Sequence, residues 1–173
     1  MDIIAYCTVS QRSAVARAAG VEPLTSPPLT ANTFDPGLLD NRDFLFFSLH
    51  GREGDVHWYG DDDELALHTA AFRDLDLSRT VVFVANCHLS TSPFLGAILR
   101  AGPRLLVAGD GPNYTRSGDL VGTGLLGYYL RHAVQIGFPP QRAYRLAVAR
   151  LAFRTRALRR RARHGDPQAV EDL

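Results

Sequence analysis

Lysine is absent from this chain of 173 residues, and all 19 of its basic residues are arginine. The 18 acidic residues nearly balance them, which leaves a formal net charge of +1 at pH 7. A charge this close to zero does not indicate a nucleic-acid-binding protein or an acidic interaction tail. The use of arginine alone carries no functional meaning here, because codon bias in a GC-rich genome is enough to produce it.

Cysteine is also scarce, with only Cys7 and Cys87. Two cysteines do not make the disulfide framework of a small secreted protein, so free thiols in a reducing compartment are expected. No segment has the apolar length of a transmembrane helix, and the first residues lack the charged-then-apolar layout of a signal peptide. We therefore expect a cytoplasmic protein with no membrane partner, folded as one domain with a substantial core.

Two apolar runs lie at 43–49, which is rich in aromatic residues, and at 80–87, which is rich in β-branched and aromatic residues. Each is long enough for a strand that is buried on both faces and too short for a typical helix. The first run ends at His50-Gly51, and the second ends at Cys87. Ligands of open α/β sheets bind at the carboxyl edge of the strands. If the two strands are parallel neighbours, His50 and Cys87 face each other across that edge.

Shorter patterns predict the other elements. Further strands are expected at 3–9 and 104–109, and residues 56–59 are expected to form one arm of a small hairpin. Helices are expected at 11–19, 64–75, 92–100 and 120–136, and from 139 onward. The Pro-rich and Ser/Thr-rich residues 21–40 are typical of a loop or short irregular pieces. Strands separated by helices indicate an α/β protein with a mostly parallel sheet between two helical layers.

The order of these features resembles the caspase-like cysteine peptidases of clan CD, and most closely their CHAT-type branch. The resemblance rests on an apolar strand followed by His50-Gly51 and, 37 positions later, an apolar strand ending in Ala-Asn-Cys at Cys87. It continues through the Ala-Gly turn and apolar run at 101–108, and through the aromatic-rich and alanine-rich segments of 124–149. It implies a caspase-like three-layer α/β/α sandwich. A peptidase domain over 1–153 and an Arg-rich helix end with a frayed tail over 154–173 are expected.

The same resemblance implies roles for individual residues. Cys87 is the expected nucleophile and His50 the expected general acid/base, since a nearby histidine favours the reactive thiolate and protonates the leaving amine. The backbone N–H groups of Gly51 and Cys87 are the expected oxyanion hole, where glycine permits close approach. Asp110, at the tip of the strand near 104–109, is a candidate for an acidic pocket that selects Arg or Lys before the cut bond. The resemblance implies a protein or peptide substrate, a regulatory partner chain, and neither cofactor nor metal.

Each of these roles has a simpler alternative. Cys87 is also explained as a small core residue, and His50 as a partner for a strand-end carbonyl. Asp110 is also explained as a turn former in Gly-Asp-Gly-Pro. A catalytically inactive adaptor of the same fold is the main rival to the cysteine endopeptidase.

Other chemically interesting residues are given structural roles. Cys7, at the end of a predicted strand, is expected to be buried, and His88 is expected to point away from Cys87 if its strand continues. His57 and His68 lack metal-ligand spacing with any cysteine. Asp61-Asp62-Asp63 is a second acidic candidate, also explained as the start of the helix at 64–75. The seven arginines within 150–163 are interpreted as the solvated face of a terminal helix, so a nucleic-acid partner is not expected.

Overall fold

A computed structural model of the chain describes residues 1–113, 120–166 and 169. Its centre is a sheet of five parallel strands in the order β2-β1-β3-β7-β8. These strands are β1 (Ile3–Thr8), β2 (Leu24–Ser26), β3 (Phe44–Ser48), β7 (Val81–Val84) and β8 (Leu105–Ala108). Every residue of β3 and β7 is buried. Continuous apolar runs of this kind are what a parallel sheet covered on both faces requires.

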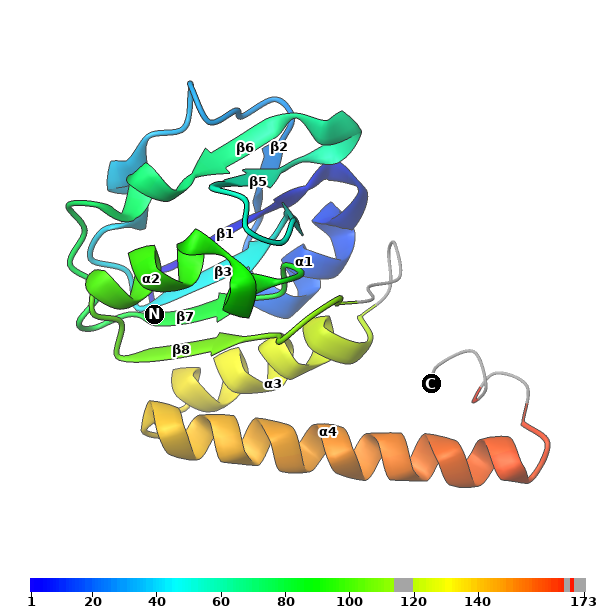
Figure 1. Ribbon diagram of the computed structural model, residues 1–173. Helices are drawn as coiled ribbons and strands as arrows, with labels where there is room; N and C mark the ends of the chain where they lie inside the picture. Colours follow the sequence, from blue (N-terminus) through cyan, green and yellow to red (C-terminus); the bar gives the residue numbers. More distant parts are fainter. Residues whose placement is uncertain (114–119, 167–168, 170–173) are drawn as a thin grey trace.

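Helices cover both faces of this sheet (Figure 1). They are α1 (Arg12–Ala19), α2 (Pro93–Arg100), α3 (Gly122–Gln135) and α4 (Pro140–Arg163). On one face α1 and α3 pack against Phe46 and Phe83, and on the other α2 packs against Phe47 and its neighbours. α4 lies outside α3, which is the element it mainly contacts. The expectation of an α/β fold with a parallel central sheet is confirmed.

α3 approaches the sheet closely because position 127 is glycine. A β-carbon at Gly127 would lie 2.5 Å from the ring of Phe46 and 2.8 Å from that of Phe83. Those two rings pack against each other with centroids 4.9 Å apart. The glycine that weakens the helical pattern of this segment therefore serves the packing of the helix on the sheet.

A small antiparallel sheet follows β3. Its strands, β4 (His50–Gly51), β5 (His57–Tyr59) and β6 (Leu65–His68), are ordered β4-β5-β6. Trp58 of β5 is fully buried and stacks on Phe94 of α2, with ring centroids 3.9 Å apart. The prediction of a hairpin arm at 56–59 is confirmed.

The prediction of a helix at 64–75 is wrong. This segment forms β6 and the short 3₁₀ helix η4 (Thr69–Phe72). The acidic residues before it make a turn, η3 (Asp61–Asp63), in which Asp62 and Asp63 have left-handed φ angles of 56° and 60°. Pairing of β6 with β5 buries Ala66 and Leu67, and this tertiary gain outweighs a weak local preference for helix.

The other helices begin and end close to the predicted residues, and Gly20 closes α1 in the left-handed conformation. The short strand β2 was missed within 21–40, where a loop was expected. Three further 3₁₀ helices are η1 (Val9–Gln11), η2 (Pro36–Leu39) and η5 (Leu89–Thr91). α4 runs without interruption through position 153, and most of the tail predicted to be frayed lies outside the described residues. Within the described residues, the helices lack the length and apolar character needed to cross a bilayer.

Candidate active site at the carboxyl edge of the sheet

The two predicted catalytic residues follow neighbouring parallel strands. β3 and β7 pair from Phe44 opposite Val81 to Phe47 opposite Val84, a constant offset of 37 residues. His50 and Cys87 are separated by the same offset of 37. The strands are therefore adjacent, as expected, and His50 and Cys87 both follow them at the carboxyl edge of the sheet.

Beyond the paired residues of β3 and β7, the segments that follow the two strands stay in contact through Asn86. The Asn86 side-chain oxygen accepts the backbone N–H of Leu49 at 2.8 Å, in place of a regular ladder bond. Asn86 is fully buried, and its amide nitrogen has no hydrogen-bond partner within the described residues. One position further, a β-carbon at Gly51 would lie 2.2 Å from the carbonyl oxygen of Cys87. Only glycine allows the two backbones to approach this closely.

Cys87 is half-buried, and its sulfur contacts the loop that follows β8. The backbone N–H of Asn113 donates to Cys87 Sγ at 3.2 Å, and the thiol in turn lies 3.6 Å from the Asn113 carbonyl oxygen. The next residue, His88, adopts a left-handed φ of 58° and donates its N–H to Gly111 at 3.0 Å. β7 has ended at Val84, so the condition on which His88 was expected to point away from Cys87 does not hold.

Asn113 organises this edge, and sequence reasoning missed it. Its side-chain nitrogen donates to the carbonyl oxygens of Ala85, at 3.2 Å, and Asn86, at 2.8 Å. Gly109 leaves room for that side chain, since a β-carbon at 109 would lie 2.4 Å from it. The sequence did offer one indication of this role. Asn113 ends the Gly-rich segment that follows β8, and asparagine in such turns commonly bonds to the backbone.

His50 is the first residue of β4, and its side chain is 54% exposed. Its Nε2 lies 4.0 Å from Asp61 Oδ1. The Asp61 carboxylate is held in turn by the backbone N–H and the hydroxyl of Ser10, both at 2.8 Å. No hydrogen bond joins the His50 ring to the Cys87 thiol in the described part of the chain. Such bonds are commonly long until substrate is bound.

Asp110 lies two residues beyond β8, on the same edge of the sheet. It is exposed, and its carboxylate accepts a hydrogen bond from the Ser90 hydroxyl. Ser90 belongs to η5, directly after the Cys87 loop. Asp110 therefore places a negative charge beside the loop that carries Cys87.

Cys7 has the opposite environment to Cys87. It is fully buried in β1, as expected, and burial raises the pKa of its thiol to about 12, with further contributions from Asp61 and Glu22. A thiol in this state is a poor nucleophile. Within the described residues, no group of three or more His, Cys, Asp and Glu side chains is arranged to hold a metal ion.

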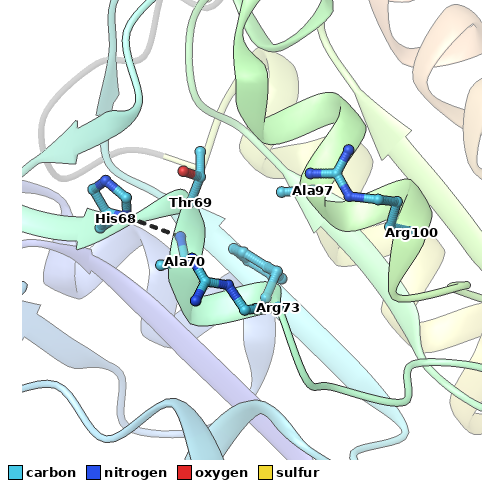
Figure 2. A pocket seen from close by; sticks show the side chains of 7 residues that line it. His68, Thr69, Ala70, Arg73, Ala97 and Arg100 are labelled. Atoms are coloured by element: carbon cyan, nitrogen blue, oxygen red, sulfur yellow. Dashed lines mark hydrogen bonds between the residues drawn. The ribbon is translucent and has the colours of Figure 1, made fainter.

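A separate cavity of about 230 Å³ lies between η4 and α2 (Figure 2). Arg73 and Arg100 extend along its two sides, and His68 accepts the Ala70 N–H at 2.9 Å. None of its lining residues belongs to the edge that carries His50 and Cys87.

Comparisons of the chain with protein-family models, curated proteins and solved structures found no match.

Proposed function

We propose that this protein is a caspase-like cysteine endopeptidase of the CHAT type, with Cys87 as nucleophile and His50 as general acid/base. The observation that supports this most strongly is the common offset of 37 residues in the β3–β7 register and in the His50–Cys87 spacing. Buried backbone pairing fixes the register of β3 and β7, and the close approach of Gly51 to the Cys87 carbonyl keeps the two segments together beyond it. The parallel sheet with helices on both faces is the framework that such an enzyme needs.

In the proposed reaction, the Cys87 sulfur attacks the carbonyl carbon of the scissile peptide bond while His50 takes the thiol proton. The charge that develops on the carbonyl oxygen is received by the N–H groups of Gly51 and Cys87. The C–N bond then breaks, and His50 gives its proton to the leaving amine. Water attacks the resulting thioester with His50 as base, and the carboxylic acid leaves as the Cys87 thiol is restored.

Two contacts support this assignment of roles. The Asn113 N–H points at Cys87 Sγ, and an N–H donor stabilises negative charge on sulfur better than it stabilises a neutral thiol. Asp61, held by two bonds from Ser10, is near enough to restrain the His50 ring. Asn113 and Asp61 are thus positioning residues in this proposal.

The substrate is proposed to carry a basic residue before the cut bond. Asp110 supplies a carboxylate at the same sheet edge, and an Arg side chain is able to engage a carboxylate with two parallel hydrogen bonds. We place the reaction in the cytoplasm, under the control of a partner chain.

A catalytically inactive adaptor is the second candidate. The observation that favours it is that the His50 ring is near Asp61 while the Cys87 thiol is bonded to Asn113. In an adaptor these contacts are the permanent state, and the same edge serves only to bind a protein segment.

Thiol alkylation separates the two candidates without knowledge of the substrate. The native protein is treated with iodoacetamide between pH 5 and 9, and the labelled positions are mapped by mass spectrometry. The peptidase proposal expects Cys87 to react first and His50→Ala to slow its labelling at neutral pH. Buried Cys7 is the internal control, because it should react only after unfolding.

The same measurement is repeated with the activating partner once it is known, since an untriggered enzyme reacts slowly. If Cys87 labels at the rate of an ordinary exposed thiol and His50→Ala leaves that rate unchanged in both conditions, the adaptor is the better description.

A further inference from the structure

The balanced net charge of the chain conceals a strong separation of charge. α4 contains nine of the 19 arginines and none of the 18 acidic residues. With a total of +1, the remainder of the chain carries −8 while α4 alone carries +9. Charge asymmetry of this size between segments is a recognised sign of a polyanionic partner.

Most of these arginines have no partner among the described residues that would account for them. Among the described residues, the only ion pair of α4 joins Arg161 to Asp166 at 2.6 Å. Arg142 and Arg150 are above the rings of Phe138 and Tyr129, at 5.2 and 5.0 Å. The arginines that make neither kind of contact in the described chain are Arg145, Arg154, Arg156, Arg159, Arg160 and Arg163.

The spacing of the arginines is unfavourable for the isolated helix. Arg150 and Arg154, like Arg156 and Arg160, are four residues apart, where like charges repel. A solvated helix usually relieves such repulsion with Asp or Glu at this spacing, and α4 has neither. Complementarity to the helix dipole accounts for arginines in the last turn only.

An aromatic ring lies in the middle of this charged face. Phe153 is 75% exposed, and its neighbours one turn away on the helix surface include Arg150 and Arg156. Figure 1 shows α4 as the outermost element, with its C-terminal half extending past α3. The face opposite α3 is therefore open to a large partner.

We propose that the outward face of α4 binds single-stranded nucleic acid, with phosphates on its arginines and a base stacked on Phe153. Guanidinium groups contact phosphates with paired hydrogen bonds, and an exposed ring beside them is the arrangement that holds unpaired bases. An anionic membrane fits less well, because Ala143 and Ala147 of α4 are buried. The large apolar side chains that stay exposed on α4 do not all lie on one face of the helix, as insertion into a membrane surface requires; they are Tyr144, Leu146, Val148 and Phe153. This replaces the interpretation of the arginines as a merely solvated face, and it is independent of the peptidase chemistry.

The test measures the affinity of the full chain for a fluorescein-labelled 20-nucleotide poly-U strand, by anisotropy, from 50 to 300 mM salt. Binding is expected at low salt. The logarithm of the association constant should fall linearly as the logarithm of the salt concentration rises. The Arg156→Gln/Arg160→Gln variant should reduce that slope by about 1.4, at roughly 0.7 per lost phosphate contact on a single strand. Phe153→Ala should weaken binding by about 5- to 100-fold without changing the slope.

The control is Arg73→Gln/Arg100→Gln, which removes the same charge from the cavity of Figure 2. It should leave both affinity and slope unchanged. The proposal is overturned if the wild-type chain does not bind at 50 mM salt, or if the control variant loses as much as the α4 variant. It also fails if Phe153→Ala has no effect, or if the chain binds phosphatidylserine vesicles but not the strand.

Discussion

Gly51 lies against the main chain of Cys87, so closely that a β-carbon on Gly51 would be 2.2 Å from the Cys87 carbonyl oxygen. This contact connects the strand that carries His50 to the loop that carries the thiol. Gly51→Ala should push the two apart, lowering stability by about 1–3 kcal/mol as overpacking does. If the proposed peptidase mechanism holds, it should also reduce turnover by about 100-fold, because displacing reacting groups by about 1 Å costs that much.

Urea unfolding and the rate of Cys87 alkylation measure the two effects of Gly51→Ala separately. Gly96→Ala is the matched control, because the added methyl group there meets only the flexible end of Arg100, at 3.3 Å. Unchanged alkylation of Cys87 in Gly51→Ala would show that the close contact does not set the geometry of the site.

Asn113 provides a second test of how the edge is held together. Its side-chain nitrogen bonds to the carbonyl oxygens of Ala85 and Asn86. Asn113→Ala removes both bonds and should cost about 1–2 kcal/mol in the free energy of unfolding. Asn113→Asp should be worse, because a carboxylate would face two carbonyl oxygens.

Both Asn113 variants keep the backbone N–H that points at Cys87 Sγ, so they report on the position of the loop rather than on this donor. Thermal unfolding and kcat/KM are measured for each. If Asn113→Asp is as active and stable as the wild-type chain, the side-chain contacts do not organise the loop.

The preference for a basic residue is tested at Asp110. Three peptides that differ only in Arg, Leu or Asp before the cut bond are compared by kcat/KM. The Arg peptide should be cleaved fastest, and Asp110→Asn should reduce its cleavage by about tenfold or more while changing the Leu peptide little. Ser90→Ala, which removes the hydroxyl bonded to Asp110 but no charge, is the control. Equal cleavage of all three peptides by the wild-type chain would exclude Asp110 from the substrate pocket.

The buried thiol of Cys7 predicts a loss of stability at alkaline pH. Burial raises its pKa from 9.0 to about 12, so the folded state keeps a proton that the unfolded state gives up above pH 9. This contribution to stability is complete below pH 9 and is lost progressively as pH rises toward 12. Urea unfolding of the wild-type chain from pH 7 to 10.5 should show a decline that is shallower in Cys7→Ala. Tyr6, whose pKa is raised from 10.0 to about 12, leaves a smaller decline in both proteins.

The strands at 43–49 and 80–87 were predictable because each holds a run of at least four consecutive apolar residues, at 44–47 and 81–85. The spacing of 37 residues between His50 and Cys87 was also visible in the sequence. The segment at 64–75 was not predictable in the same way. Its acidic start favours a helix locally, but burial of Ala66 and Leu67 under Trp58 decides for a strand. β2 has only three residues and too little pattern of its own. Asn113 was missed because its partners, two carbonyl groups more than 25 residues away, leave no trace in local sequence.

The chain between β3 and β7 holds the whole antiparallel sheet and η4, while the strands on either side of it are short. Changes in chain length should therefore have very different effects in the two places. A residue inserted at 73–79, between η4 and β7, lengthens a connection and leaves the β3–β7 register intact. A residue inserted within 44–48 moves the later side chains of β3 to the opposite face of the sheet. It also separates the spacing of His50 and Cys87 from the β3–β7 register. Homologues of this chain should accordingly vary in the length of the connection. They should keep the number of residues from the start of β3 to His50 and from the start of β7 to Cys87.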